Sequence, residues 1–167
     1  HPGSELWLRT GATADAVRAS MALPGLCTPA QRDGRLLVDG GLVDNLPVRE
    51  VRDHCKADVV IAVNVGSPLL KAEEVGSLLT VSAQMIGILT EQNVQASIAL
   101  LKPTDLLISP ELGNYTTADF DELPKIALLG EPAARKVATR LEQFSLPPDA
   151  YAALRRRQTV AQAPDLK

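Results

Sequence analysis

A short Asp-Gly-Gly sequence is the local feature of this chain best suited to chemistry. Asp39 follows the apolar run Leu36-Leu37-Val38 and precedes Gly40 and Gly41. The ends of apolar strands are where α/β folds build their sites, and glycines let the backbone turn or approach another segment closely. A carboxylate held there could orient or deprotonate a hydroxyl group once water is excluded. The same residues also suit an ordinary tight turn, so the pattern alone leaves both interpretations open.

The serine and histidine residues do not form a recognisable catalytic triad. No serine stands in a Gly-x-Ser-x-Gly sequence, which would expose its hydroxyl on a sharp strand-to-helix turn. The histidines are His1 and His54, and His54 falls in the last turn of a predicted helix, where a cation complements the helix dipole. Metal-assisted hydrolysis through Asp39 and Asp44 is a further alternative, although the acidic residues fit no calcium-loop spacing. We expect no metal and no cofactor.

Composition narrows the class of protein. The chain has 167 residues, and its 17 basic and 20 acidic residues give a formal net charge of -3. So mild a balance argues against a nucleic-acid partner, which would need a concentrated basic face. Aromatic residues make up only 3% while hydrophobic residues make up 46%, so we expect a globular protein with an aliphatic core.

The elements that would position Asp39 are expected to alternate between strands and helices. The run at residues 59–66 is continuous, apolar and β-branched, which is typical of a strand buried on both faces in a parallel sheet. A loop is expected over residues 24–34, with a turn at residues 32–34. The long helix expected over residues 72–101 should be partly buried, because its apolar stripe meets the polar Asn93 and Ser97. Strand, helix and strand in this order predict an α/β fold. The expected strands cover residues 6–8, 36–38, 59–66 and 104–109, and the expected helices cover residues 14–23, 48–54, 72–101, 121–130, 132–144 and 149–158.

An ordered set of motifs resembles the second half of a bacterial patatin-like phospholipase domain. The set lies in residues 14–51, ADAVRASMALPGLCTPAQRDGRLLVDGGLVDNLPVREV. It comprises Ala19-Ser20 near a helix end, Pro24 in a loop, Asp39-Gly40-Gly41 after a strand, and Asn45-Leu46-Pro47. The resemblance continues through residues 59–66 and 104–112, Asp119-Phe120 and Gly130, and it covers roughly residues 4–145.

The resemblance implies a fold and a division of the chain. It implies an α/β three-layer sandwich with a mainly parallel, patatin-like sheet whose N-terminal part is missing. Residues 1–146 are then the C-terminal part of a patatin-like hydrolase domain, and residues 147–167 are a terminal helix and the start of a linker. The glycine-rich oxyanion loop and the serine elbow of this family lie upstream of the resembling region, and this chain has neither.

The resemblance also implies a reaction and roles for particular residues. In such Ser-Asp dyad hydrolases the aspartate of Asp-Gly-Gly activates the serine without histidine, and Asp39 matches that aspartate. Gly40, Gly41 and Asn45 would form the supporting turn, and Leu23, Pro24 and Leu26 would wall the acyl pocket. A carboxylate is a weak base, so this mechanism depends on placement, a dry site and oxyanion donors.

The implied partners are a phospholipid or lysophospholipid substrate, a membrane surface, and the N-terminal part of the same protein, which would supply the serine. The alternative is a catalytically inactive patatin-like binding or scaffold module. Residues 77–95 and the Arg155-Arg156-Arg157-Gln158 helix resemble secreted Gram-negative members. In those members a periplasmic POTRA domain and an outer-membrane domain follow. The expected location is therefore secreted or outer-membrane associated, with a cytoplasmic location as the alternative.

Overall fold

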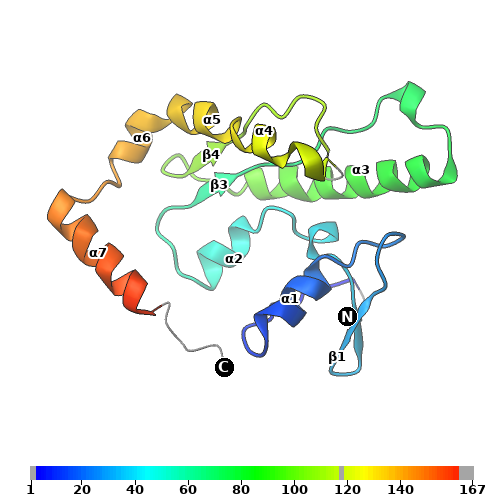
Figure 1. Cartoon of the computed structure of the whole chain (residues 1–167), viewed down its shortest axis with the longest axis horizontal. Helices are drawn as coiled ribbons and strands as arrows, with labels where there is room; N and C mark the ends of the chain where they lie inside the picture. The colour runs from blue at the N-terminus through cyan, green and yellow to red at the C-terminus, as the bar shows by residue number, and fades with distance from the viewer. Residues whose placement is uncertain (1–2, 117–118, 162–167) are drawn as a thin grey trace.

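The computed structural model of the chain describes residues 3–116 and 119–161 (Figure 1). Helices dominate these ranges, and the strands are short. The strands are β1 (Ala30–Arg32), β2 (Arg35–Leu37), β3 (Ile61–Val63) and β4 (Leu106–Ile108). The α-helices are α1 (Thr13–Ser20), α2 (Val48–Asp53), α3 (Leu78–Ile98), α4 (Leu123–Ala127), α5 (Gly130–Lys136), α6 (Ala138–Glu142) and α7 (Pro148–Ala161), and the 3-10 helices are η1 (Gly40–Leu42), η2 (Ala72–Glu74) and η3 (Phe120–Glu122).

A β-hairpin precedes Asp39. Strands β1 and β2 pair antiparallel, with Arg32 opposite Arg35. The turn between them uses Asp33 and Gly34 at φ +51° and +73°, the backbone conformation that favours a two-residue hairpin loop. The turn predicted at residues 32–34 is thus confirmed. The prediction of an uninterrupted loop over residues 24–34 is wrong, because the tight turn brings residues 30–32 alongside β2.

A small parallel sheet lies in the middle of the chain. β3 and β4 pair parallel, with Ile61 opposite Leu106, and α3 lies between them in the sequence. This unit confirms the α/β prediction for the described part. The expectation that residues 59–66 are buried on both faces is wrong, since Ala62 is 5% exposed while Ile61 and Val63 are 46% and 47% exposed. One face of β3 packs on the core, and the described residues leave the other face uncovered.

The strand predicted at residues 6–8 is absent from the structure, because within the described ranges no strand runs beside this segment to pair with it. Side chains hold the segment instead. Arg9 donates a hydrogen bond to Glu50 Oε1 at 2.6 Å, and Arg32 donates to the carbonyl of Thr10 at 2.8 Å.

Helix α3 begins later than expected. Ser77 accepts a hydrogen bond from the backbone N–H of Thr80, whose side chain accepts from the N–H of Ser77, and this reciprocal capping defines the helix start. The first residues, Leu78 and Leu79, are exposed, whereas Val94 and Ser97 near the other end are buried. This gradient confirms a partly buried helix. None of the helices in the described ranges has the length and apolar character needed to cross a membrane.

The C-terminal region forms a chain of short helices, η3 and α4 to α6, where the sequence predicted two longer ones. The terminal helix predicted at residues 149–158 is confirmed by α7, which extends away from β3 and β4 (Figure 1). The division of the chain after residue 146 stays a prediction.

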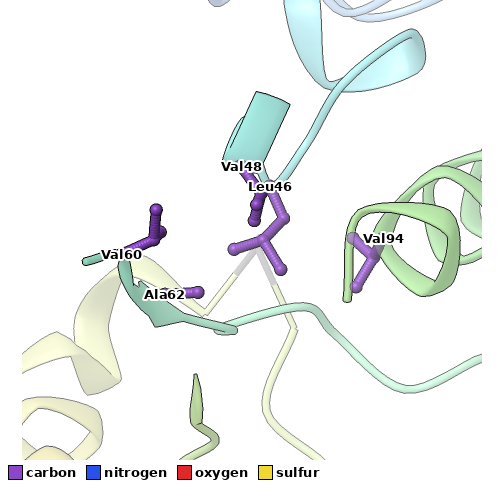
Figure 2. Close-up of a cluster of buried hydrophobic side chains, with 5 residues drawn as sticks. All are labelled: Leu46, Val48, Val60, Ala62 and Val94. Atoms are coloured by element: carbon purple, nitrogen blue, oxygen red, sulfur yellow. The ribbon is translucent and has the colours of Figure 1, made fainter. Parts of the chain in front are cut away.

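The core joins α2, β3 and α3. Figure 2 shows Leu46 between Val94 of α3 on one side and Val60 and Ala62 of the β3 segment on the other, with Val48 beside it. These five side chains are each at most 6% exposed. Because Leu46 follows Asn45 directly, the core anchors one end of the segment that carries the Asp-Gly-Gly sequence.

Candidate active site

Asp39 sits where β2 passes into η1, and two hydrogen bonds orient it. Its backbone N–H donates to the carbonyl of Ala22 at 3.0 Å, which ties the strand end to the segment after α1. Its side-chain Oδ1 accepts from the N–H of Gly41 at 2.8 Å. The side chain is half-buried. Among the described residues no hydrogen-bond partner is found for Oδ2, so one carboxylate oxygen is fixed and the other is available for chemistry.

A cavity of about 500 Å³ lies against Asp39. Its lining is mixed, and the polar members are Ser4, Glu5, Ser20, Arg35 and Asp39. The apolar lining residues are Leu6, Leu8, Leu36, Leu37, Val38 and Val43. Small-molecule sites combine apolar walls with a few convergent polar groups, and here one of the polar groups is an oriented carboxylate.

The two glycines play different parts in the turn. Neither has a positive φ. A Cβ on Gly41 would lie 2.8 Å from Asn45 Oδ1 and 3.1 Å from Asp39 Oδ1, whereas one on Gly40 would meet only Ser20 Oγ at 3.6 Å. A larger residue at Gly41 would therefore displace the ends of the Asn45 and Asp39 side chains. Of the residues predicted to support the turn, Gly40 and Gly41 follow Asp39 directly and the Asn45 side chain lies close to Gly41; their supporting role stays a prediction.

Helix α3 supplies a further support that the sequence analysis did not assign. Asn93 Nδ2 donates to the carbonyl of Gly41 at 2.9 Å, and Asn93 Oδ1 accepts from the N–H of Asn45 at 2.9 Å. One turn later on α3, the hydroxyl of Ser97 lies 3.4 Å from Asp44 Oδ1. A signal did exist in the sequence, because Asn93 and Ser97 are the polar residues that interrupt the apolar stripe of this helix.

Asp44 points toward α3, and its environment disfavours the charge. Burial raises the pKa of Asp44, and the nearby Glu5 carboxylate raises it further, against the hydrogen bonds from Leu46 N–H and Ser97. Asp44 does not line the cavity beside Asp39, so the structure does not bring these two aspartates into one site.

No cluster of three His, Cys, Asp or Glu side chains in residues 3–116 and 119–161 is arranged to hold a metal ion. The N-cap of α2 is Pro47, without a side-chain cap.

The structure does not bring the predicted acyl-pocket residues into this cavity. Leu23, Pro24 and Leu26 lie in the turn after α1, and Leu26 is 80% exposed. None of the three belongs to the cavity lining found in the described ranges. Their role as walls of an acyl pocket stays a prediction.

Ser4 and Ser20 both line the cavity with Asp39, and Ser20 is the one whose hydroxyl lies beside Gly40 of the Asp-Gly-Gly turn. It lies at the end of α1 in the sequence Ala19-Ser20-Met21. No hydrogen bond joins its hydroxyl to the Asp39 carboxylate in the described part of the chain. The arrangement therefore presents an oriented base on a cavity without a serine bound to it.

Sequence comparison with known proteins points to the same segment of the chain. Residues 2–52, which contain Asp39 and its turn, match the sequence model of the family described as patatin-like phospholipase. The chain is 28% identical over 157 residues to "Lysophospholipase NTE1" of Debaryomyces hansenii, covering 79% of this chain and 10% of that protein.

Bacterial proteins also match. An uncharacterized NTE family protein of Mycobacterium tuberculosis is 43% identical over 63 residues, or 38% of this chain and 17% of its own length. An uncharacterized NTE family protein of Mycobacterium bovis is 31% identical over 135 residues, or 81% of this chain and 23% of its own. The first relatives are thus much longer, and the chain spans 10% to 17% of their length.

Proposed function

We propose that this chain carries the aspartate-bearing part of a lipid acyl hydrolase of the patatin-like phospholipase family. The main observation behind the proposal is that Asp39, in the segment that matches the family, presents an oriented carboxylate to a cavity with both apolar and polar walls. The relatives named as lysophospholipases support a phospholipid or lysophospholipid ester as the substrate. The proposed fold of the complete domain is the three-layer α/β sandwich of the family.

The proposed reaction uses Asp39 as the base of a Ser-Asp dyad. The carboxylate takes the proton of a serine hydroxyl as the serine oxygen attacks the ester carbonyl carbon. The tetrahedral intermediate then breaks the bond to the alcohol, which leaves with the proton returned by Asp39. In the second half, Asp39 takes a proton from water as the water oxygen attacks the acyl carbon, and it returns this proton to the serine oxygen as the fatty acid is released. The hydrogen bond from Gly41 N–H fixes the carboxylate for these proton transfers.

We place the nucleophile outside residues 1–167, upstream of the Asp-Gly-Gly segment. No serine of the chain stands in Gly-x-Ser-x-Gly, and Asp39 binds no serine in the described ranges. The cavity of about 500 Å³ beside Asp39 leaves space in which part of an incoming segment or an acyl chain could lie. A secreted or outer-membrane location is a separate proposal, which fractionation of the source cells would test.

The dyad is tested by fatty-acid release from lysophosphatidylcholine micelles by the full-length gene product. We expect Asp39→Asn to lower turnover by about 10²- to 10⁴-fold, the usual contribution of a positioned base. Asp33→Asn is the matched control, because Asp33 is an exposed hairpin-turn residue whose positive φ asparagine accepts well. Undiminished turnover by folded Asp39→Asn would rule out the proposed role.

An inactive binding module is the second candidate, and the absence of a serine elbow from this sequence favours it. It predicts that the full-length gene product also lacks Gly-x-Ser-x-Gly, and that it binds lysophospholipid micelles without releasing fatty acid. Reading the complete coding sequence and assaying hydrolysis separate the two candidates.

A further inference from the structure

We propose that Asn93 of α3 is a positioning residue for Asp39, acting through the peptide groups of the Asp-Gly-Gly turn. The inference rests on the proposed function, since it assigns a second residue to the same dyad. It concerns a side chain 54 positions beyond Asp39 in the sequence and outside residues 2–52 that match the family.

The side-chain amide of Asn93 both donates and accepts a hydrogen bond at the turn. Its Nδ2 donates to the carbonyl of Gly41 at 2.9 Å, and its Oδ1 accepts from the N–H of Asn45 at 2.9 Å. Gly41 in turn donates its own N–H to Asp39 Oδ1 at 2.8 Å. One glycine therefore connects the helix to the carboxylate: its carbonyl is held by Asn93, and its N–H holds Asp39.

A carboxamide side chain suits this pair of hydrogen bonds. The carbonyl of Gly41 needs a donor and the N–H of Asn45 needs an acceptor, and a carboxamide supplies both from one rigid plane. Aspartate would face the Gly41 carbonyl with a second acceptor, and leucine would leave both backbone groups without a partner from α3.

Both segments that these hydrogen bonds join are anchored in the hydrophobic core. Val94, next to Asn93, is 2% exposed, and Leu46, next to Asn45, is 6% exposed. Figure 2 shows these two side chains facing one another in the same cluster. Asn93 and Asn45, which are joined by a hydrogen bond, are thus each adjacent to a buried core residue. The position of α3 therefore fixes the position of the turn.

Placement matters here because a carboxylate is a weak base and the dyad depends on geometry. A displacement of about 1 Å at a reacting group can cost about 10²-fold in rate. Release of the Gly41 peptide would free the donor that orients Asp39, while the cavity wall, built mainly by other residues, would remain. The inference therefore predicts an effect on kcat with little effect on KM.

The experiment compares Asn93→Leu and Asn93→Ala with Gln92→Leu in the full-length gene product. Gln92 is an exposed amide on the same helix, and no hydrogen bond joins it to any described residue. We expect both Asn93 variants to lower kcat for an activated ester by about 10- to 100-fold with KM unchanged, and Gln92→Leu to leave both constants unchanged. Alanine is the folding-safe variant because it is the best helix former.

A double-mutant cycle separates positioning from a general structural role. Since Asn93 acts through Asp39, adding Asn93→Ala to Asp39→Asn should not lower the residual rate further. A further loss of the same size in the double variant, or a kcat loss matched by loss of folded protein, would overturn the inference.

The two proposals fail in different ways. Full turnover by folded Asp39→Asn would remove the proposed function. Inactive Asp39→Asn together with full kcat in both Asn93 variants would remove only the positioning role of Asn93.

Discussion

At the level of single residues, the Asp-Gly-Gly turn needs its second glycine for reasons of space. Gly41 has an ordinary φ, but the position of its missing Cβ is taken by the side chains of Asn45 and Asp39. Two glycines in sequence are compatible with a turn or with a close approach to another segment, and at Gly41 the structure shows a close approach. The first glycine is under no such restriction.

Gly41→Ala is therefore expected to destabilise the protein while Gly40→Ala changes stability much less. A Cβ 2.8 Å from Asn45 Oδ1 must push aside the ends of the Asn45 and Asp39 side chains. Because these ends can move, we expect a cost of about 1 kcal/mol, the low end for overpacking. Urea denaturation of both variants measures the difference. Equal free energies of unfolding would contradict the spatial argument.

Asp44→Asn is expected to stabilise the protein at neutral pH. Burial and the nearby Glu5 raise the pKa of Asp44 above the ordinary value of 3.8, so its charged form opposes folding above the folded-state pKa. That cost disappears as the pH falls through the raised pKa and Asp44 gains a proton. The gain in thermal midpoint should thus be largest near pH 7 and shrink in acid. A gain that is independent of pH would contradict this account.

At the level of secondary-structure elements, buried Asp105 joins α2, β3, β4 and the segment before β4. It accepts hydrogen bonds from Val60 N–H at 2.9 Å and Lys102 N–H at 2.6 Å, and it forms an ion pair with Arg52. Burial alone would raise the pKa of Asp105, but these backbone donors and the Arg52 guanidinium together hold it below its ordinary value. The carbonyl of Asp105 also accepts from Arg140 of α6 at 2.6 Å.

Asp105→Asn is expected to lower the free energy of unfolding at pH 7 by about 3 kcal/mol, because it leaves Arg52 without its buried partner. The folded-state pKa of Asp105 is lowered, so its contribution is complete above the ordinary value of 3.8 and is lost as the pH falls through the folded value. The variant should therefore differ least from the native protein in strong acid. Asp58→Asn, at an exposed carboxyl group, is the control, and an equal loss in both would contradict the role of Asp105.

At the level of the whole molecule, much apolar surface is left exposed. Leu78 and Leu79 at the start of α3 are 83% and 78% exposed, and Leu36 of the hairpin is 74% exposed. Each of the two sheets found in the described ranges has two strands. Many large hydrophobic side chains of the described ranges are exposed in this way, and this supports the proposal that a further segment of the protein completes the fold.

Residues 1–167 produced alone are expected to release no fatty acid from lysophospholipid micelles above background, because the proposed nucleophile lies outside them. The full-length gene product assayed at equal molar concentration is the positive control. Hydrolysis by the isolated chain that Asp39→Asn abolishes would show that the nucleophile lies within it.

Local patterns predicted much of the fold and the centre of the site. The hairpin turn, α1, α3, the strand positions at β3 and β4, and the turn containing Asp39 follow from residue types that act over a few positions. The pairing of β2 with β1, the missing strand at residues 6–8 and the exposed face of β3 did not follow. A strand exists only when a neighbour pairs with it, and the neighbour is not determined by the strand itself.

By itself, then, the sequence determined that an aspartate followed by two glycines ends a strand. It also determined that a long helix follows, whose apolar stripe is interrupted by two polar residues. Only the tertiary structure decided that these features meet. Asn93 reaches Gly41 across 52 positions and Ser97 reaches Asp44 across 53. Hydrogen-bond donors and acceptors in the sequence do not specify their partners at such separations, because partners are chosen by how the apolar core packs one element against another.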